Sequence, residues 1–374
     1  MKELTPSIVP FGIGPSTRLV GLLGYPVAHS LSPAMHNACF RSLGWDVRYL
    51  AFAVPPERLG QAIAGIRGLD LIGVNVTIPH KEAVLPYLDQ VEPQARGAGS
   101  VNTIRNQEAQ LLGFNTDGPA FLALLREEGR LDPAGKRAVI LGTGGTARTV
   151  ASYLKRAGIA HLTIAGRNWE KSVRLAQETG AEAGVHLPGS GPSGETKAAE
   201  PAPPVPGTAP ASERREATPH IPGLPEAIRD ASDPTAAYLW GKSPYRRASG
   251  ESDFSLGPAT AHPPALEQIT FADCLDQADV LINCTSAGLY PRVEGCPLTS
   301  LDPLPRGALV VDVIYNPPHT RLMTLASRRG NQVLGGLGLL IRQASLAWEI
   351  WFGQVAPLEI MRRAAEGILS QNVE

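Results

Sequence analysis

Residues 139–148, with the sequence VILGTGGTAR, constrain the fold of this chain more than any other stretch. An apolar strand-like run ends here in a glycine-rich turn, and the turn opens a segment with the apolar spacing of a helix. The glycines suit a tight turn and a close approach to a diphosphate, and the start of a helix attracts phosphate. Similar turns occur in other α/β units. The predicted dinucleotide-binding residues are Gly142, Gly144, Gly145, Thr146 and Ala147.

The end of the next predicted strand, residues 161–165, indicates which dinucleotide would bind. Proteins that bind NAD usually carry an acidic residue there for the ribose 2′-hydroxyl. This chain has Arg167 instead, and Lys171 follows one helical turn later. Two cations suit a 2′-phosphate, so NADP is favoured over NAD. Lys171 taken alone is equally well explained as a solvated helix lysine.

The length and composition of the chain restrict the class of protein to which it can belong. A chain of 374 residues exceeds one ordinary core and predicts two domains. The net charge of −1, without a basic block, argues against nucleic acid as a partner. No apolar run reaches the ~20 residues that span a bilayer, and the N-terminus lacks a signal pattern, so a cytoplasmic location is expected. The four scattered cysteines predict free thiols and no metal site.

The first part of the chain is predicted to form strands at residues 18–23, 47–54 and 69–76. Ser32 and Pro33 make a good helix start between the first two strands, with the serine as N-cap. Ser30 has no such local role. Two hydroxyls two residues apart at a helix entry could hold a carboxylate, although capping alone explains Ser32 equally well.

Polar side chains gather where the third strand ends. Asn75 and Thr77 fall on the same side of an extended chain because strand side chains alternate. Lys81 follows at a strand-to-helix junction, and this position favours a functional site over a merely solvated lysine. His80 is predicted to be an exposed or capping histidine.

A turn and two short strands, the second at residues 110–114, predict a hairpin-like pair before Asp117. Asp117 begins an amphipathic helix, where an N-cap aspartate is a strong alternative to a functional role. We predict the domain boundary here. Residues 18–117, completed by residues 339–374, would form the first domain, and residues 118–338 would form a Rossmann-type second domain.

The second domain is interrupted by a long segment at residues 181–265. It holds 15 of the 34 prolines of the chain in 85 residues. Such a composition cannot build a helix or a central strand, which predicts a disordered or loosely packed insertion. A short apolar island at residues 236–240 could be a docking point.

Regular structure is predicted to resume at Phe271, with strands at residues 279–283, 309–314 and 332–334. The first two end in polar loops, which line the ligand crevice in open α/β sheets. A helix then begins at Leu339 and carries Gln343, for which an ordinary exposed glutamine is the simpler explanation. Further candidates for cofactor contacts are Thr285, Ser286, Ile314 and Gly336.

Seven stretches, taken in this order, resemble shikimate dehydrogenase over about residues 18–180 and 266–370. They are residues 29–33, 75–81, 99–103, 115–118, 142–145 with Arg167, 315–317, and 336–338 with Gln343. That family reduces 3-dehydroshikimate to shikimate with NADPH. The resemblance therefore implies two α/β domains with the active site between them, NADP(H) as cofactor and a small-molecule substrate.

The resemblance also implies roles for individual residues. It gives the substrate carboxylate to Ser30 and Ser32, and the catalytic pair to Lys81 and Asp117, which also contact substrate. Carbonyl reduction needs positive charge or a proton donor at the developing alkoxide, and Lys81 can supply either. The ring-hydroxyl contacts fall on Asn75, Thr77, Asn102, Asp117, Tyr315 and Gln343.

Some positions depart from the family. Gly166 and Asn168 flank Arg167 where asparagine and threonine are frequent, and Leu339 replaces a usual methionine. A quinate/shikimate dehydrogenase that uses NAD or both cofactors stays open, as does an aminoshikimate dehydrogenase. A non-catalytic ligand sensor should have lost Lys81 or Asp117. The insertion could bind a partner, and a homodimer is the assembly to test.

Overall fold

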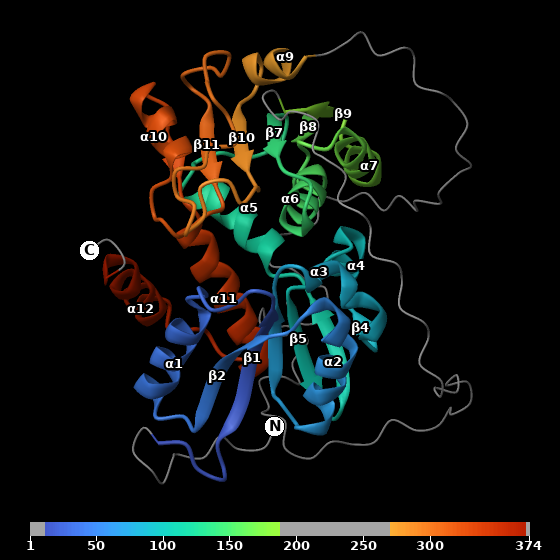
Figure 1. Cartoon of the computed structure of the whole chain (residues 1–374), viewed down its shortest axis with the longest axis vertical. Coiled ribbons are helices and arrows are strands. Elements are labelled where there is room, and N and C mark those ends of the chain that lie inside the picture. The colour runs from blue at the N-terminus through green and yellow to red at the C-terminus, as the bar shows by residue number, and fades with distance from the viewer. Residues whose placement is uncertain (1–11, 188–269, 372–374) are drawn as a thin grey trace, which may run out of the picture. The chain divides into compact units, whose positions relative to one another are not determined.

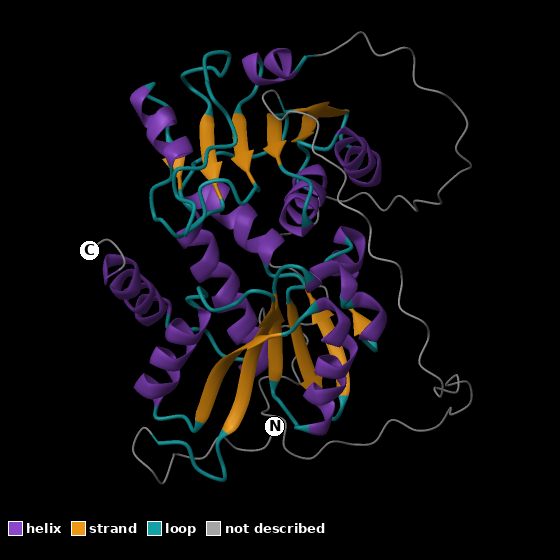
Figure 2. Cartoon of the chain, in the orientation of Figure 1, coloured by secondary structure: helices purple, strands orange, loops and turns teal. Residues whose placement is uncertain are grey.

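The computed structural model describes residues 12–187 and 270–371, which form two six-stranded sheets with helices packed on them (Figures 1 and 2). The alternation of short apolar runs with helical segments is the sequence origin of this α/β arrangement.

The first sheet has the strand order β2-β1-β3-β5-β6-β4. β1 pairs in parallel with β2 and β3, whereas β5 is antiparallel to both β3 and β6. Its strands are β1 (Arg18–Gly24), β2 (Val47–Ala53), β3 (Gly73–Val76), β4 (Gln90–Val91), β5 (Thr103–Gln107) and β6 (Gln110–Phe114). The hairpin predicted around residues 110–114 is thereby confirmed.

Helices cover both faces of this sheet. The helices of this part are α1 (Ser32–Leu43), α2 (Leu59–Gly68), α3 (His80–Ala83) and α4 (Pro93–Ala98), with 3-10 turns η1 (Pro56–Arg58) and η2 (Leu85–Tyr87). One face packs on α2 through Ile63 and Ile66. The other face packs on α1 together with the C-terminal helices α11 (Gly336–Phe352) and α12 (Leu358–Gln371). The C-terminus therefore completes the core of the first sheet.

The second sheet is parallel throughout and has the order β12-β11-β10-β7-β8-β9. Its strands are β7 (Arg137–Leu141), β8 (His161–Gly166), β9 (Ala183–His186), β10 (Val280–Asn283), β11 (Leu309–Asp312) and β12 (Val333–Leu334). The order reverses at β7, so the turn after β7 lies at the switch point where ligands bind in such sheets.

Alternate side chains of each central strand enter different cores. Ala138 and Ile140 pack with α5 (Asp117–Glu127), α6 (Gly145–Arg156) and α7 (Trp169–Thr179) on one face. Val139 and Leu141 pack with α9 (Phe271–Asp276) and α10 (Arg321–Arg328) on the other. Burial on both faces explains why these strands are continuous apolar runs in the sequence.

Several boundaries differ from the sequence-based expectation, among them the end of β11, which is Asp312 rather than residue 314. β3 begins at Gly73 rather than at Leu69, and α11 begins at Gly336, inside the glycine run, rather than at Leu339. β9 adds an edge strand at Ala183–His186, within the segment predicted to be an insertion from residue 181. Weakly apolar edge strands give little pattern to detect. Residues 188–265 of the predicted insertion, including residues 236–240, lie outside the described residues.

None of the helices in the described ranges is long and apolar enough to cross a membrane.

Candidate active site

The centre of the candidate site is an ion pair between Lys81 and Asp117. Lys81 lies on the short helix α3 that follows β3, and Asp117 is the first residue of α5. The Lys81 Nζ donates to Asp117 Oδ2 at 2.6 Å, and the two side chains are only 13% and 11% exposed. A carboxylate is favoured at the start of a helix by the N-terminal dipole. The N-cap alternative for Asp117 is wrong, because Thr116 occupies that position and makes no side-chain cap bond.

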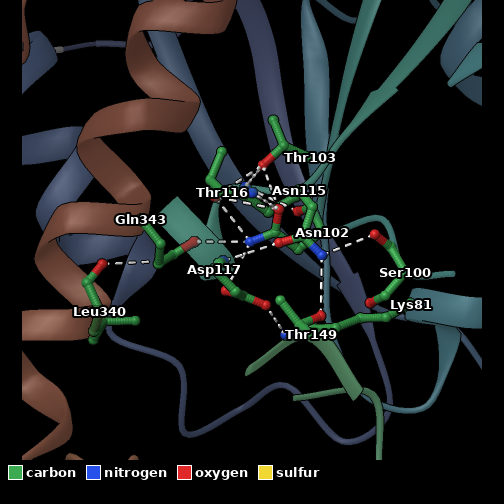
Figure 3. A network of polar contacts seen from close by, with 12 residues as sticks. Lys81, Ser100, Asn102, Thr103, Asn115, Thr116, Asp117, Thr149, Leu340 and Gln343 are labelled. Carbon is green, nitrogen blue, oxygen red and sulfur yellow. Dashed lines mark hydrogen bonds and ion pairs between the residues drawn. The ribbon is translucent and has the colours of Figure 1, made fainter. Parts of the chain in front are cut away.

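Asn102 fixes the aspartate from the opposite side (Figure 3). Its Nδ2 donates to Asp117 Oδ1 at 2.8 Å and to Thr116 Oγ1 at 2.9 Å, while its Oδ1 accepts the Thr116 backbone N–H at 2.8 Å. Gln343 of α11 approaches the same amide, with 3.5 Å from Asn102 Nδ2 to its Oε1. Gln343 is therefore part of the group rather than an ordinary exposed glutamine. Each oxygen of Asp117 has a separate donor.

A second amide, Asn75 at the end of β3, joins the same network. Its Nδ2 donates to Thr103 Oγ1 at 3.0 Å, and Thr103 Oγ1 donates to Asn102 Oδ1 at 3.1 Å. Its Oδ1 accepts the hydroxyl of Tyr49 at 2.8 Å. Burial raises the pKa of Tyr49. The chain of contacts thus runs from Tyr49 through Asn75, Thr103 and Asn102 to Asp117 and Lys81.

Tyr49, Thr103 and Thr116 are the members of this network to which the sequence assigned no role. Thr103 and Asn75 are register partners on neighbouring antiparallel strands. The strand that begins at Thr103 is mostly polar, so the sequence carries no signal that marks this residue. The hydroxyl of Tyr49 carries no such signal, because tyrosine is ordinary in a strand.

The two serines behave differently from their predicted local roles. α1 begins at Ser32 with Leu31 as N-cap, and no side chain caps the helix from the N-cap position. The Ser30 Oγ instead accepts the Ser32 backbone N–H at 3.2 Å, so Ser30 does have a local role. The expectation of Ser32 as N-cap is wrong. Both hydroxyls keep a proton that can be donated to a carboxylate.

Three other residues singled out in the sequence follow the ends of strands, His80 and Thr77 after β3 of the first sheet and Tyr315 after β11 of the second. His80 is buried, with its Nε2 2.7 Å from the Val54 carbonyl, so the prediction of an exposed or capping histidine is wrong. Thr77 follows β3 and Tyr315 follows β11, and both are half-buried. Within residues 12–187 and 270–371, neither side chain hydrogen-bonds to the Lys81 group. Burial raises the pKa of Tyr315.

The glycine turn after β7 has the geometry that a phosphate requires. Gly142 has a φ of +114°, where a side chain would be strained, and Gly144 is the extended N-cap of α6. No atom outside the turn lies within 4 Å of a β-carbon built at Gly144, so the turn leaves room for a ligand. Ala147 is fully buried, while Thr146 is half-buried. These features fit a diphosphate at the start of α6.

The turn also lies close to the ion pair. A β-carbon at Gly145 would be 3.6 Å from the Cβ of Lys81. On the next turn of α6, Thr149 Oγ1 accepts Asn115 Nδ2 at 3.1 Å, and the same amide donates to the Ser100 carbonyl at 2.8 Å. The Asn115 amide therefore connects the first part of α6 to the loop that carries Asn102.

Of the two predicted phosphate-binding cations, Arg167 directly follows β8 and Lys171 lies in the first turn of α7. Arg167 and Lys171 are both exposed, and the Lys171 backbone N–H is bonded to Asn168 Oδ1 at 2.8 Å. A β-carbon at Gly166 would lie 2.7 Å from Ser172 Oγ and 2.8 Å from Thr143 Cγ2. The larger residue that the family often has at this position would not fit here, which explains the departure.

The remaining cofactor candidates follow β10 and β11. Thr285 is half-buried, Ser286 is exposed and Ile314 is buried. Gly336 is the first residue of α11, and a β-carbon there would clash with the carbonyl of Val313. No cluster of three or more acidic, histidine or cysteine residues suited to a metal occurs in the described part of the chain.

Three family models match the chain. The "Shikimate dehydrogenase substrate binding domain" matches residues 22–104, and "Shikimate / quinate 5-dehydrogenase" matches residues 125–188. The "Shikimate 5'-dehydrogenase C-terminal domain" matches residues 336–366.

Two curated relatives extend over nearly the whole chain. The shikimate dehydrogenase (NADP(+)) of Symbiobacterium thermophilum is 39% identical and covers 93% of this chain and 93% of its own length. That of Moorella thermoacetica is 40% identical and covers 93% and 92%.

Solved structures share the fold. A shikimate dehydrogenase in complex with NADP+ is 30% identical, with a TM-score of 0.67, covering 96% of this chain and 98% of its own. The Thermus thermophilus enzyme in complex with NADP(H) and shikimate is 28% identical, with a TM-score of 0.64 and coverage of 94% and 99%. The 5-ketofructose reductase of a Gluconobacter species is 29% identical, with a TM-score of 0.64 and coverage of 95% and 100%.

Proposed function

This chain belongs to the shikimate dehydrogenase family, and we propose that Lys81 and Asp117 carry out its reaction, the reversible NADP-dependent reduction of 3-dehydroshikimate to shikimate. The observation that carries the assignment of these residues is their 2.6 Å ion pair, held by Asn102 and adjacent to Gly145 of the glycine turn. The curated relatives are NADP(+)-dependent, and shikimate and NADP(H) are bound together in the Thermus structure.

The residues present fit the cofactor. The glycine turn and the start of α6 would hold the diphosphate, and Arg167 and Lys171 would bind the 2′-phosphate that distinguishes NADP from NAD. Thr285, Ile314 and Gly336 would lie along the nicotinamide half. Bound NADPH supplies the hydride.

Lys81 stabilises the negative charge that develops on the carbonyl oxygen during reduction, because its ammonium is held in a largely water-excluded site. Its ammonium can also donate the proton that converts the alkoxide to a hydroxyl, and in the reverse direction the amine accepts it. Asp117 keeps the lysine oriented, since one carboxylate oxygen is bound by Lys81 and the other by Asn102.

The substrate would be oriented by the two serines and by the polar groups of the network. Ser30 and Ser32 would donate to its carboxylate, and Asn75, Thr77, Asn102, Tyr315 and Gln343 would contact its ring hydroxyls. The hydrogen bonds from Tyr49 through Asn75 and Thr103 to Asn102 support this arrangement, because they fix the groups at the hydroxyl end relative to one another. Such preorganisation lowers the cost of bringing the carbonyl to Lys81.

The test is the initial rate of NADP+ reduction with shikimate, with NAD+ and quinate as matched comparisons. Turnover that is fast only with shikimate and NADP+ is expected. Comparable rates with quinate or NAD+ would instead indicate the dual-specificity enzyme, and shikimate binding without turnover would indicate a sensor.

Lys81→Ala should lower kcat by roughly 10²- to 10⁴-fold, the range typical of an acid–base group. The matched control is Lys136→Ala, a half-exposed lysine paired with Asp279. Near-normal kcat with weakened shikimate binding in Lys81→Ala would contradict proton transfer.

Three further features are part of the proposal. Residues 18–117 with 339–374 would be the substrate domain and residues 118–338 the cofactor domain, supported by the core that β1, α1 and β2 share with α11 and α12. A homodimer is expected and is tested by light scattering of the eluted protein. A cytoplasmic location is tested by cell fractionation.

A further inference from the structure

β10 and β11 are neighbouring central strands, and both end in a polar residue that is completely buried. Asn283 is the last residue of β10 and Asp312 the last of β11, and the two are register partners. Both have an exposure of 0%. Neither belongs to the Lys81 network, and the sequence assigned neither a role.

The two side chains bind one another and the loops that follow the strands. Asp312 Oδ1 accepts Asn283 Nδ2 at 3.0 Å and the Ile314 backbone N–H at 3.1 Å, while Oδ2 accepts Thr320 Oγ1 at 2.7 Å. Asn283 Oδ1 accepts both the backbone N–H of Thr285 at 2.9 Å and its hydroxyl at 2.7 Å. Five hydrogen bonds thus connect two strand ends with Thr285, Ile314 and Thr320.

Resting on the proposed function, we propose that Asp312 is a positioning residue for the cofactor: it holds the loops after β10 and β11 in the geometry that binds NADP(H). Two of the residues bound through this network, Thr285 and Ile314, are those expected to face the nicotinamide half. Neither Asp312 nor Asn283 would touch the cofactor itself.

The energetics favour a positioning role over simple packing. An ionised carboxylate in a dry interior costs several kcal/mol unless its lone pairs are satisfied, so an apolar side chain would stabilise the strand end more cheaply. Burial accordingly raises the pKa of Asp312, although its bonds to Thr320, Ile314 and Asn283 lower it. Asn283 comes from the neighbouring strand, whereas Ile314 and Thr320 belong to the loop after β11. What the carboxylate contributes is therefore the placement of that loop against the end of β10.

The effect of Asp312 extends to α11. The Ile314 N–H is bound by Asp312, and the Ile314 carbonyl accepts the Gly336 N–H at 3.0 Å. Gly336 is the first residue of α11, and Gln343 lies two turns along the same helix. Ile314 is therefore fixed at both its amide and its carbonyl. A displacement at Asp312 would move the start of the helix that carries Gln343.

Asp312→Asn tests the proposal because it keeps the size of the side chain and removes the charge. One amide oxygen can still accept Asn283 and Ile314, as Oδ1 does in the wild type. The second oxygen is replaced by an NH₂ group, which cannot accept the hydrogen bond that the Thr320 hydroxyl donates. The matched control is Asp279→Asn, at the opposite end of β10. Asp279 Oδ2 also accepts a backbone N–H, that of Arg137, at 2.8 Å.

The readout is the Kd for NADP+ measured by calorimetry without shikimate, together with the Tm of each variant. Asp312→Asn should raise this Kd by roughly tenfold or more, about 1.4 kcal/mol. Asp279→Asn should lower the Tm but change the Kd by less than twofold. A folded Asp312→Asn protein with a Kd within twofold of wild type would overturn the proposal. Because binding is measured without turnover, a wild-type protein that binds NADP+ but does not oxidise shikimate would refute the proposed function and leave this test valid.

Thr320 provides a second pair of variants in case Asp312→Asn does not fold. Thr320→Val removes the bond to Asp312 Oδ2, whereas Thr320→Ser keeps the hydroxyl. Thr320→Val should weaken NADP+ binding by roughly threefold, a fraction of the full effect, and Thr320→Ser should restore wild-type affinity. Equal affinity in the two variants and wild type would again contradict the positioning role.

Discussion

Lowering the pH from 7 to 5 should destabilise the protein through one residue, His36 on α1. Its ring is fully buried and stacks between Tyr49, with centroids 4.5 Å apart, and Trp348, at 6.1 Å. Among the described residues, neither of its ring nitrogens has a hydrogen-bond partner. Burial without a partner for the charged form lowers the pKa of His36 from 6.5 to about 3.

The direction and the size of the pH effect on stability follow from this shift in the pKa of His36. In the unfolded chain His36 takes up a proton as the pH falls through 6.5, whereas the folded protein keeps the ring neutral until about pH 3. Protons therefore bind preferentially to the unfolded state in this window, so stability is lost as the pH falls. One pKa unit corresponds to ~1.36 kcal/mol, which gives a loss of about 2 kcal/mol between pH 7 and pH 5. The loss continues to roughly 4 kcal/mol near pH 3.

The assay is urea unfolding at pH 7 and pH 5 for the wild type and for His36→Phe, which keeps an aromatic ring in the stack but cannot titrate. The difference in free energy of unfolding between the two pH values should be about 2 kcal/mol smaller in His36→Phe. His319→Gln, at an exposed histidine, should keep the wild-type difference. Equal pH dependence in wild type and His36→Phe would refute the reasoning, whatever the absolute stability of the variant.

Two shorter predictions concern residues of the proposed cofactor site, one of them on stability and the other on cofactor preference. Gly336→Ala should destabilise the protein by about 1–3 kcal/mol, because the new methyl meets a backbone carbonyl that cannot move freely. Thermal unfolding measures this, and Gly307→Ala, with open space around it, should be nearly neutral. Arg167→Ala should lower the ratio of kcat/KM for NADP+ over NAD+ by roughly tenfold or more, since it removes a charge from the proposed 2′-phosphate site. An unchanged ratio would mean that Arg167 does not read the phosphate.

Features that depend on neighbouring residues in the chain could be predicted from the sequence. The strand, turn and helix around Gly142 match the structure, since an apolar run and two glycines act locally. The strand at residues 110–114 also matches. The prediction of Ser32 as N-cap is wrong, although Ser-Pro is a good local signal for a helix start. The hydroxyl that accepts a backbone N–H there is that of Ser30, and the N–H belongs to Ser32.

Burial and pairing across strands could not be predicted in this way. His80 follows a proline in a polar stretch, and only the approach of Val54 from the end of another strand makes it a buried, bonded residue. Thr103 acquires its place from Asn75, which is 28 residues earlier in the chain. Sequence spacing identifies polar residues at strand ends, whereas their partners are decided by strand order.

Each of the two sheets has an asparagine that donates to an aspartate, and the two pairs nevertheless differ in chemistry. In the first sheet Asn102 donates to Asp117 at 2.8 Å, and in the second Asn283 donates to Asp312 at 3.0 Å. Each asparagine holds one carboxylate oxygen. The difference lies in the other oxygen: in Asp117 it binds an ammonium, and in Asp312 it binds the neutral hydroxyl of Thr320. Asp117 orients an ammonium that can transfer a proton, whereas Asp312 binds only neutral donors and fixes their positions. The same pair of residue types is therefore proposed to perform catalysis at one strand end and cofactor positioning at the other.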